Sequence, residues 1–229
     1  LIKNSKYSSP FSFDTFIIFR LISLGSPLAI QLVTEMSGFV MFKMIISKLG
    51  TIELDASEIV FNVAHASFLP AAGLGQACAT LVGKSLGENN QKKAYSSIYE
   101  TIRLSAFFMG TMGLLFILFP YNILRFFSSN YIVIETGIIL LQILGIFQIF
   151  DAMCQTLWFS LNGAGDTKFP AISQMICMWG VFIPLSWISV TFFSLNLEFL
   201  WSYFILYLIL LTIILYIRIK SGKWLYMKS

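Results

Sequence analysis

Charged residues are scarce in this sequence, since Lys, Arg, Asp and Glu make up only 11% of its 229 residues. A soluble domain usually carries about 25% charged residues, so the chain has less than half of the ordinary supply. Apolar residues are abundant instead, at 57% with 23 Phe, and the mean hydropathy is +0.81. This composition excludes an ordinary cytosolic enzyme, a nucleic-acid-binding domain and a disordered tail. It predicts a polytopic protein embedded in a lipid bilayer.

Motifs for nucleotide binding and for catalysis are also missing. The sequence contains neither a GxxxxGK[ST] loop, which would cradle the phosphates of ATP, nor an HExxH metal motif. No Ser-His-Asp set is evident, and the three cysteines all lie inside apolar runs, where packing is their most common role. We therefore expect neither an enzyme nor an ATP-driven pump, and no cofactor.

Six apolar runs are long enough to cross a membrane, because about 20 apolar residues span a hydrocarbon core of ~30 Å. They predict an all-α membrane domain with spans at about 16–47, 56–83, 98–119, 132–161, 169–193 and 199–217. The polar residues 1–15 are typical of a linker, and residues 218–229 form a basic tail. Prolines inside spans remove backbone hydrogen bonds, so bends are expected at Pro27, Pro70 and Pro184.

The basic residues predict the orientation of these spans. Of the 15 Lys and Arg residues, all but Lys43, Lys48 and Arg125 fall on the side that holds both termini, which leaves twelve against three. Cytoplasmic loops carry an excess of Lys and Arg. The sequence therefore predicts that both termini are cytoplasmic.

Glu35 and Asp151 are the acidic residues deep inside predicted spans. Glu35 lies 15 residues beyond Arg20 and Asp151 lies 11 residues before Asn162, or ~22 Å and ~16 Å along their helices. Both carboxyl groups are thus expected at similar depths near the membrane centre. A charge there costs about 2.5–3.5 kcal/mol on the lenient insertion scale, which favours an ion or proton site. The alternative is that each carboxyl is protonated and only bonds a neighbouring helix.

Other polar side chains accompany the two acids. Gln31 is one turn before Glu35, and Gln148 and Gln155 share a helix face with Asp151. Asn62 and His65, the single histidine, lie in the second span. All five are candidates for the polar lining of a pocket. A lone histidine is more often a hydrogen-bonded packing residue than a proton relay, and any one aromatic ring is more often packing than part of a drug pocket.

Three stretches in this order resemble the C-terminal half of the multidrug and toxic compound extrusion (MATE) family. They are LGSPLAIQ, FLPAAGLGQACATLVGKSLGENNQKKA at 68–94, and LNGAGDTKFP at 161–170. The resemblance implies six transmembrane helices forming one lobe of a twelve-helix secondary transporter in the plasma membrane, the inner membrane in a bacterium. Such a transporter exchanges Na⁺ or H⁺ for cationic, often aromatic drugs. The other, N-terminal lobe would be a partner absent from this sequence.

In the norfloxacin-extruding branch, the C-terminal lobe carries a Glu on helix 7 and an Asp on helix 10. The resemblance assigns these positions to Glu35 and Asp151, as the site that binds Na⁺ or H⁺. That branch has an aromatic residue, often Tyr, one turn before the Asp, and Phe147 stands there. Asn162 replaces an Arg that the family often has, so the resemblance leaves the choice of ion open. A flippase for lipid-linked precursors and a non-transporting remnant are the alternative functions.

Overall fold

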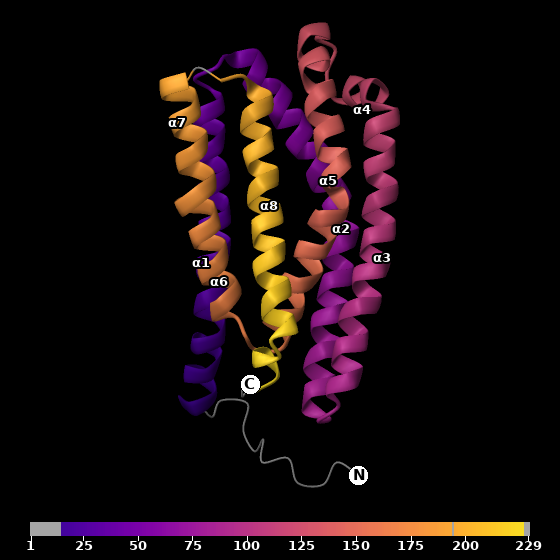
Figure 1. The fold of residues 1–229 in the computed structure, drawn as a ribbon, viewed down its shortest axis with the longest axis vertical. Coiled ribbons are helices and arrows are strands. Elements are labelled where there is room, and N and C mark those ends of the chain that lie inside the picture. The colour runs from indigo at the N-terminus through magenta and orange to yellow at the C-terminus, as the bar shows by residue number, and fades with distance from the viewer. Residues whose placement is uncertain (1–14, 194, 227–229) are drawn as a thin grey trace.

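A computed structural model describes residues 15–193 and 195–226 (Figure 1). The predicted linker, apart from Thr15, and the last three residues of the predicted basic tail therefore lie outside the described residues. The described elements are all helical: α1 (Thr15–Ile46), α2 (Thr51–Gly87), α3 (Gln91–Leu118), α4 (Pro120–Phe127), α5 (Tyr131–Gly163), α6 (Lys168–Met175), the π-helical segment η1 (Ile176–Phe182), α7 (Ile183–Phe193), α8 (Leu197–Lys220) and the 3₁₀ turn η2 (Lys223–Tyr226).

Within the described residues, six helical stretches are long and apolar enough to span a membrane, in agreement with the six predicted spans. The fifth is a composite of α6, η1 and α7. The helices also run beyond the predicted spans, because the polar segments at 49–57 and 83–97 are mostly helical. Hydropathy marks the part of a helix that lies in hydrocarbon, whereas the helix itself continues into the polar headgroup region. The connection after the third span contains the short helix α4, which the sequence did not predict.

Two groups of helices make up the bundle. Helices α2, α3 and α5 pack closely together, α1 packs mainly on α6 and α7, and α8 lies against α5 and η1 (Figure 1). Glycines allow the closest approaches in the first group. A Cβ built on Gly145 of α5 would lie 2.7 Å from the carbonyl oxygen of Gly113 in α3. Small residues at helix contacts are typical of membrane proteins.

The three predicted bend prolines have different surroundings. Pro27 and Pro70 lie inside the continuous helices α1 and α2. Pro184 is the second residue after the π-helical segment, where the hydrogen-bonding register widens. A proline cannot donate to the carbonyl four residues earlier, and its ring crowds that carbonyl. The wider turn at Ile176–Phe182 is therefore a local adjustment next to Pro184.

The two ends of the bundle differ in charge. The upper end in Figure 1 carries the α1–α2 turn and the start of α5, and the lower end carries the C-terminus and the α5–α6 turn. Two shallow hollows at the upper end are lined by acids, one by Asp55 and Glu58 and the other by Glu135 and Glu198.

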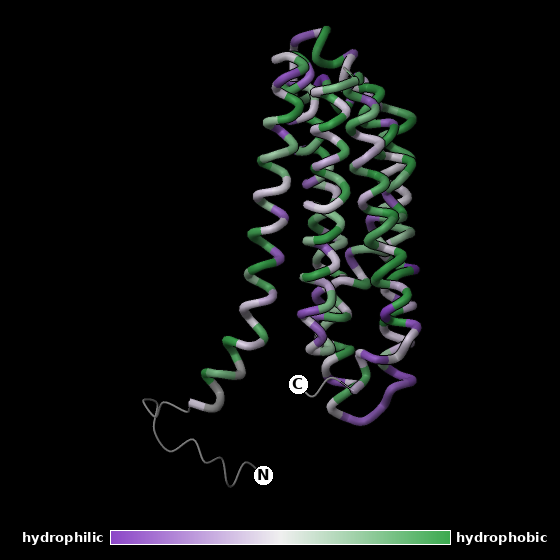
Figure 2. Tube along the Cα trace, turned by 60° about the vertical axis from the view of Figure 1, so that its left-hand side comes forward, coloured by the Kyte–Doolittle hydropathy of each residue, from purple (hydrophilic) through white to green (hydrophobic). Residues whose placement is uncertain are grey.

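Figure 2 shows the N-terminal part of α1 running away from the rest of the bundle at the lower end.

Candidate functional site

Glu35 lies on α1, beside α6 and within electrostatic reach of side chains on three other helices. Its side chain is half-buried on α1 and interacts with Gln174 of α6, which is only 4% exposed. The Glu35 carboxylate is also within electrostatic reach of His65 on α2, Asp151 on α5 and Tyr207 on α8. The structure thus places the two acids that the sequence singled out within electrostatic reach of each other, from positions more than a hundred residues apart.

Asp151 lies on the half-buried face of α5. Its carboxylate lies beside the Gln155 side chain, one turn further on. Phe147 lies one turn before Asp151 and packs against Phe150, with ring centroids 6.0 Å apart. Phe147, Asp151 and Gln155 therefore follow one face of α5, as the helical spacing predicts.

Two of the predicted pocket glutamines instead join helices together. Gln31 is completely buried, and its Nε2 donates to the carbonyl oxygen of Thr167 at 3.0 Å, while its Oε1 accepts from Asn162 Nδ2 at 3.4 Å. Gln148 is buried, and its Nε2 donates to Ser67 Oγ on α2 at 3.0 Å. Both amides are thus committed to contacts between elements.

Asn62 and His65 have a different environment. Both are exposed on α2, and the His65 ring stacks on Phe68 of the same helix with centroids 5.9 Å apart. No hydrogen bond joins His65 to another described residue. Both of these predicted pocket residues are therefore exposed rather than buried inside the bundle.

Aromatic packing fills the bundle next to Glu35, in the direction of the upper end. Phe39, one turn above Glu35, contacts the rings of Phe61 and Phe204. The cluster continues through Phe42, Phe182, Trp201 and Tyr207. Phe42, Phe182 and Trp201 are completely buried. These rings serve packing, and they separate Glu35 from the upper end of the bundle.

The residues around Glu35 suit a small hard cation or a proton. Carboxylate and amide oxygens are hard ligands, and the site offers both. The Oε1 atom of Gln174 is buried without a hydrogen-bond partner, although its side chain lies beside Glu35. Among the described residues, no group of three or more His, Cys, Asp and Glu side chains is placed to hold a metal ion. A Na⁺ ion bound here would therefore need amide oxygens as well as carboxylates.

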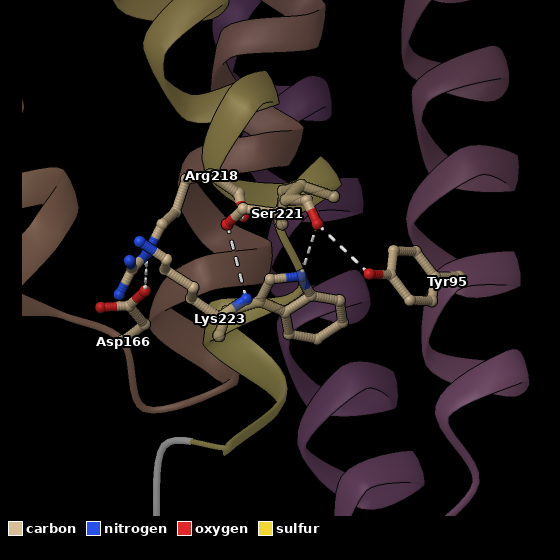
Figure 3. A network of polar contacts seen from close by, with 7 residues as sticks. Tyr95, Asp166, Arg218, Ser221 and Lys223 are labelled. Carbon is tan, nitrogen blue, oxygen red and sulfur yellow. Dashed lines mark hydrogen bonds and ion pairs between the residues drawn. The ribbon is translucent and has the colours of Figure 1, made fainter.

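Sequence reasoning missed three polar residues near this region. Gln174 lies in an apolar run, where a single amide gives no periodic signal. Arg218 and Asp166 were assigned only to the basic tail and to a turn, yet Arg218 Nε lies 2.7 Å from Asp166 Oδ2 (Figure 3). Both partners are largely shielded, with side chains 13% and 2% exposed. A charged residue that follows an apolar span gives no hint of which turn it will reach.

Comparisons with known proteins agree with this architecture. The family model MatE matches residues 27–188. The "Probable multidrug resistance protein NorM" of Thermotoga maritima is 32% identical over 205 residues, which cover 90% of this chain and 44% of that protein. The "Multidrug resistance protein NorM" of Burkholderia vietnamiensis is 29% identical over 170 residues, or 72% of this chain and 37% of that protein. The chain spans less than half the length of these curated relatives.

Solved structures show the same fold. A structure described as "MATE in the bent conformation" superposes with a TM-score of 0.84 at 16% identity, over 93% of this chain and 48% of that one. The "eukaryotic MATE transporter AtDTX14" gives a TM-score of 0.80 at 20% identity, over 96% of this chain and 50% of that one. The predicted all-α membrane fold is therefore confirmed: the six candidate spans of the described residues match about half of a MATE transporter fold.

Proposed function

Because this chain belongs to the MATE family, a family of membrane transporters and not of enzymes, we propose that it is the C-terminal lobe of a cation-coupled multidrug antiporter. In this proposal Glu35 and Asp151 bind the coupling ion, Na⁺ or H⁺, and a second six-helix lobe completes the pathway for cationic aromatic drugs. The observation that carries the proposal is that these two acids, from α1 and α5, lie within electrostatic reach of each other, with the unpartnered amide oxygen of Gln174 beside Glu35.

The charge of the site explains how the ion and the drug would compete. Two carboxylates in a low-dielectric bundle attract a cation, and a bound Na⁺ or proton neutralises at least one of them. An organic cation binds best while the site is anionic, so each ligand lowers the affinity of the site for the other, to the same extent. Gln174 would contribute its unpartnered amide oxygen to Na⁺. Phe147 and Phe150 offer ring faces near Asp151 for a cationic drug.

The charges favour a cationic substrate over a lipid-linked pyrophosphate. Glu35 and Asp151 are acidic, whereas Arg103, the basic residue inside the third span, is exposed and paired with Glu100 at 2.8 Å. An anionic headgroup would need cationic partners along its path. The excess of Lys and Arg at the lower end supports the proposed cytoplasmic location of both termini.

Neutral isosteres of the two acids test the proposal in the full product of the gene. We expect Glu35→Gln and Asp151→Asn each to reduce ethidium efflux to the level of vesicles that lack the protein. Glu135→Gln is a matched control, since Glu135 is an exposed glutamate on the same helix as Asp151. Wild-type efflux in both acid variants, at equal protein in the membrane, would refute the coupling role.

The coupling ion is decided by the gradient that drives efflux. Vesicles are loaded with ethidium and given either a Na⁺ gradient at constant pH or a pH gradient without Na⁺. The ion that drives efflux in the wild-type protein, and no longer does so in Glu35→Gln, is the coupling ion. If neither gradient drives efflux, the antiport mechanism is refuted.

A further inference from the structure

A set of buried contacts at the lower end joins α1, the α5–α6 turn and α8. Arg218, near the end of α8, holds Asp166 in the turn through the 2.7 Å ion pair, and its guanidinium lies over the Phe169 ring, 4.6 Å from the centroid. The turn is tight, with Gly165 at a φ of 84° and the Asp166 N–H donating to the carbonyl oxygen of Leu161 at 3.0 Å.

The same turn holds α1 through the neighbouring residue. Thr167 follows Asp166, and its carbonyl oxygen accepts the 3.0 Å hydrogen bond from Gln31. Gln31 lies one helical turn before Glu35, on the same side of α1. Between Thr15 and Ile30, by contrast, most described side chains of α1 are exposed, although Pro27 is buried, and the helix runs away from the bundle (Figure 2). Gln31 thus holds α1 to the α5–α6 turn by hydrogen bonds, close to the start of the part of α1 that packs against the bundle.

Arg218 is itself firmly placed. The carbonyl oxygen of the next residue, Ile219, accepts from Tyr95 of α3 at 3.3 Å and from Trp224 Nε1 of η2 at 2.9 Å (Figure 3). Trp224 is completely buried and packs edge-on against Tyr95. The end of α8 is therefore tied to α3 on one side and to the α5–α6 turn on the other.

We propose that the Asp166–Arg218 pair is a clamp that positions Glu35, acting through the Thr167 carbonyl and Gln31. The inference rests on the proposed coupling role of Glu35. A buried ion pair adds little net stability compared with an apolar pair, but it fixes one arrangement of the groups it joins. Here the ion pair fixes the α5–α6 turn, and the Thr167 carbonyl oxygen of that turn holds α1 next to Glu35.

If the clamp positions Glu35, variants of the ion pair and of Gln31 should have the same effect on the cation concentration for half-maximal efflux, and their effects should not add. Asp166→Asn removes the charge of the pair and Gln31→Leu removes the hydrogen bonds to the turn, with little change of volume. Each is expected to raise the cation concentration for half-maximal efflux about tenfold, within the usual range of coupling between sites. The double variant should be no worse than either single variant, because both changes act on the same chain of contacts.

Lys168→Met is the matched control, since Lys168 is an exposed cation on the same turn. It should leave the half-maximal cation concentration unchanged. The exchanged pair Asp166→Arg with Arg218→Asp should restore the wild-type value if the ion pair itself is required. Effects of Asp166→Asn and Gln31→Leu that multiply in the double variant would overturn the clamp.

A distance measurement tests the clamp independently of transport. Spin labels at Ala29 of α1 and Lys220 of α8, both exposed, report the separation of these helices in a variant whose three cysteines are replaced by Ala. Asp166→Asn and Gln31→Leu should broaden the distance distribution, and Lys168→Met should not. An unchanged distribution in both variants overturns the clamp, whereas wild-type efflux in Glu35→Gln refutes only the proposed function.

Discussion

The contact between α3 and α5 predicts an unusually large effect for a change of one methyl group. A Cβ added at Gly145 would lie 2.7 Å from the carbonyl oxygen of Gly113, 2.9 Å from Ile117 Cγ1 and 3.2 Å from Phe116 Cβ. An oxygen of the helix backbone cannot move aside as a side chain can. The two helices must therefore separate, and Gln148, three residues after Gly145, must shift its buried hydrogen bond to Ser67.

The expected loss follows from two opposing terms. Overpacking a tight contact costs about 1–3 kcal/mol, and alanine gains back up to about 1 kcal/mol over glycine in a helix. For Gly145→Ala we expect a net loss of roughly 1–2 kcal/mol, or a fall in Tm on the order of 5 °C. Gly110→Ala is the control, because its added Cβ would meet only the Ile149 side chain at 3.4 Å. That variant should match or exceed the wild-type Tm.

Thermal unfolding of the purified protein in detergent, followed by the loss of monodisperse material, measures both variants side by side. A second variant isolates the cause, since Ile117→Ala removes the side-chain part of the contact and leaves the backbone oxygen. Gly145→Ala should therefore remain destabilising in an Ile117→Ala background. If Gly145→Ala is as stable as Gly110→Ala, or if Ile117→Ala restores it fully, the backbone contact does not limit the approach of α3 and α5.

Three further predictions concern single side chains. Gln174→Leu should weaken Na⁺ activation of efflux and leave H⁺ activation unchanged if the unpartnered Gln174 oxygen binds Na⁺, which a comparison of the two gradients tests. Trp201→Phe should cost about 1 kcal/mol beyond its loss of packing, because the buried Ser57 hydroxyl loses its 3.2 Å hydrogen bond; Ser57→Ala in the same background should recover that part of the Tm. Lys43→Met should lower stability by less than about 1 kcal/mol, since the 2.8 Å pair with Glu58 is partly exposed, and a larger fall in Tm would contradict this prediction.

The sequence predicted the six spans because bilayer thickness imposes a length on each apolar run. It could not give the helix ends, since segments such as 83–97 combine a helical backbone with polar side chains. The NGAGDTK turn was predicted from its composition, and Gly165 at a φ of 84° confirms the tight geometry. The π-helical segment before Pro184 could not be predicted from the sequence, because a widened turn depends on how the neighbouring helices cover the free carbonyl.

The two acids could be selected from the sequence because a charge in a membrane span is costly in almost any fold. The residues that surround Glu35 could not be predicted from the sequence, because a buried glutamine is tolerated wherever another element supplies a hydrogen-bond partner. Gln31 meets its partner 136 residues away in the α5–α6 turn, so neither periodicity nor hydropathy can distinguish a pocket glutamine from one that joins two helices.

The packing of α1 differs above and below Glu35, which bears on how a change of charge at Glu35 would move this helix. The rings from Phe39 to Tyr207 pack tightly on the upper side of Glu35 and leave little freedom there. On the lower side, the Gln31 amide bonds α1 to the α5–α6 turn, and below that residue most described side chains of α1 are exposed, apart from the buried Pro27. A change of charge at Glu35 would therefore move the lower half of α1 more easily than the upper half. In the proposed clamp, such a movement would strain the hydrogen bonds of Gln31 and the Asp166–Arg218 ion pair beside their acceptor.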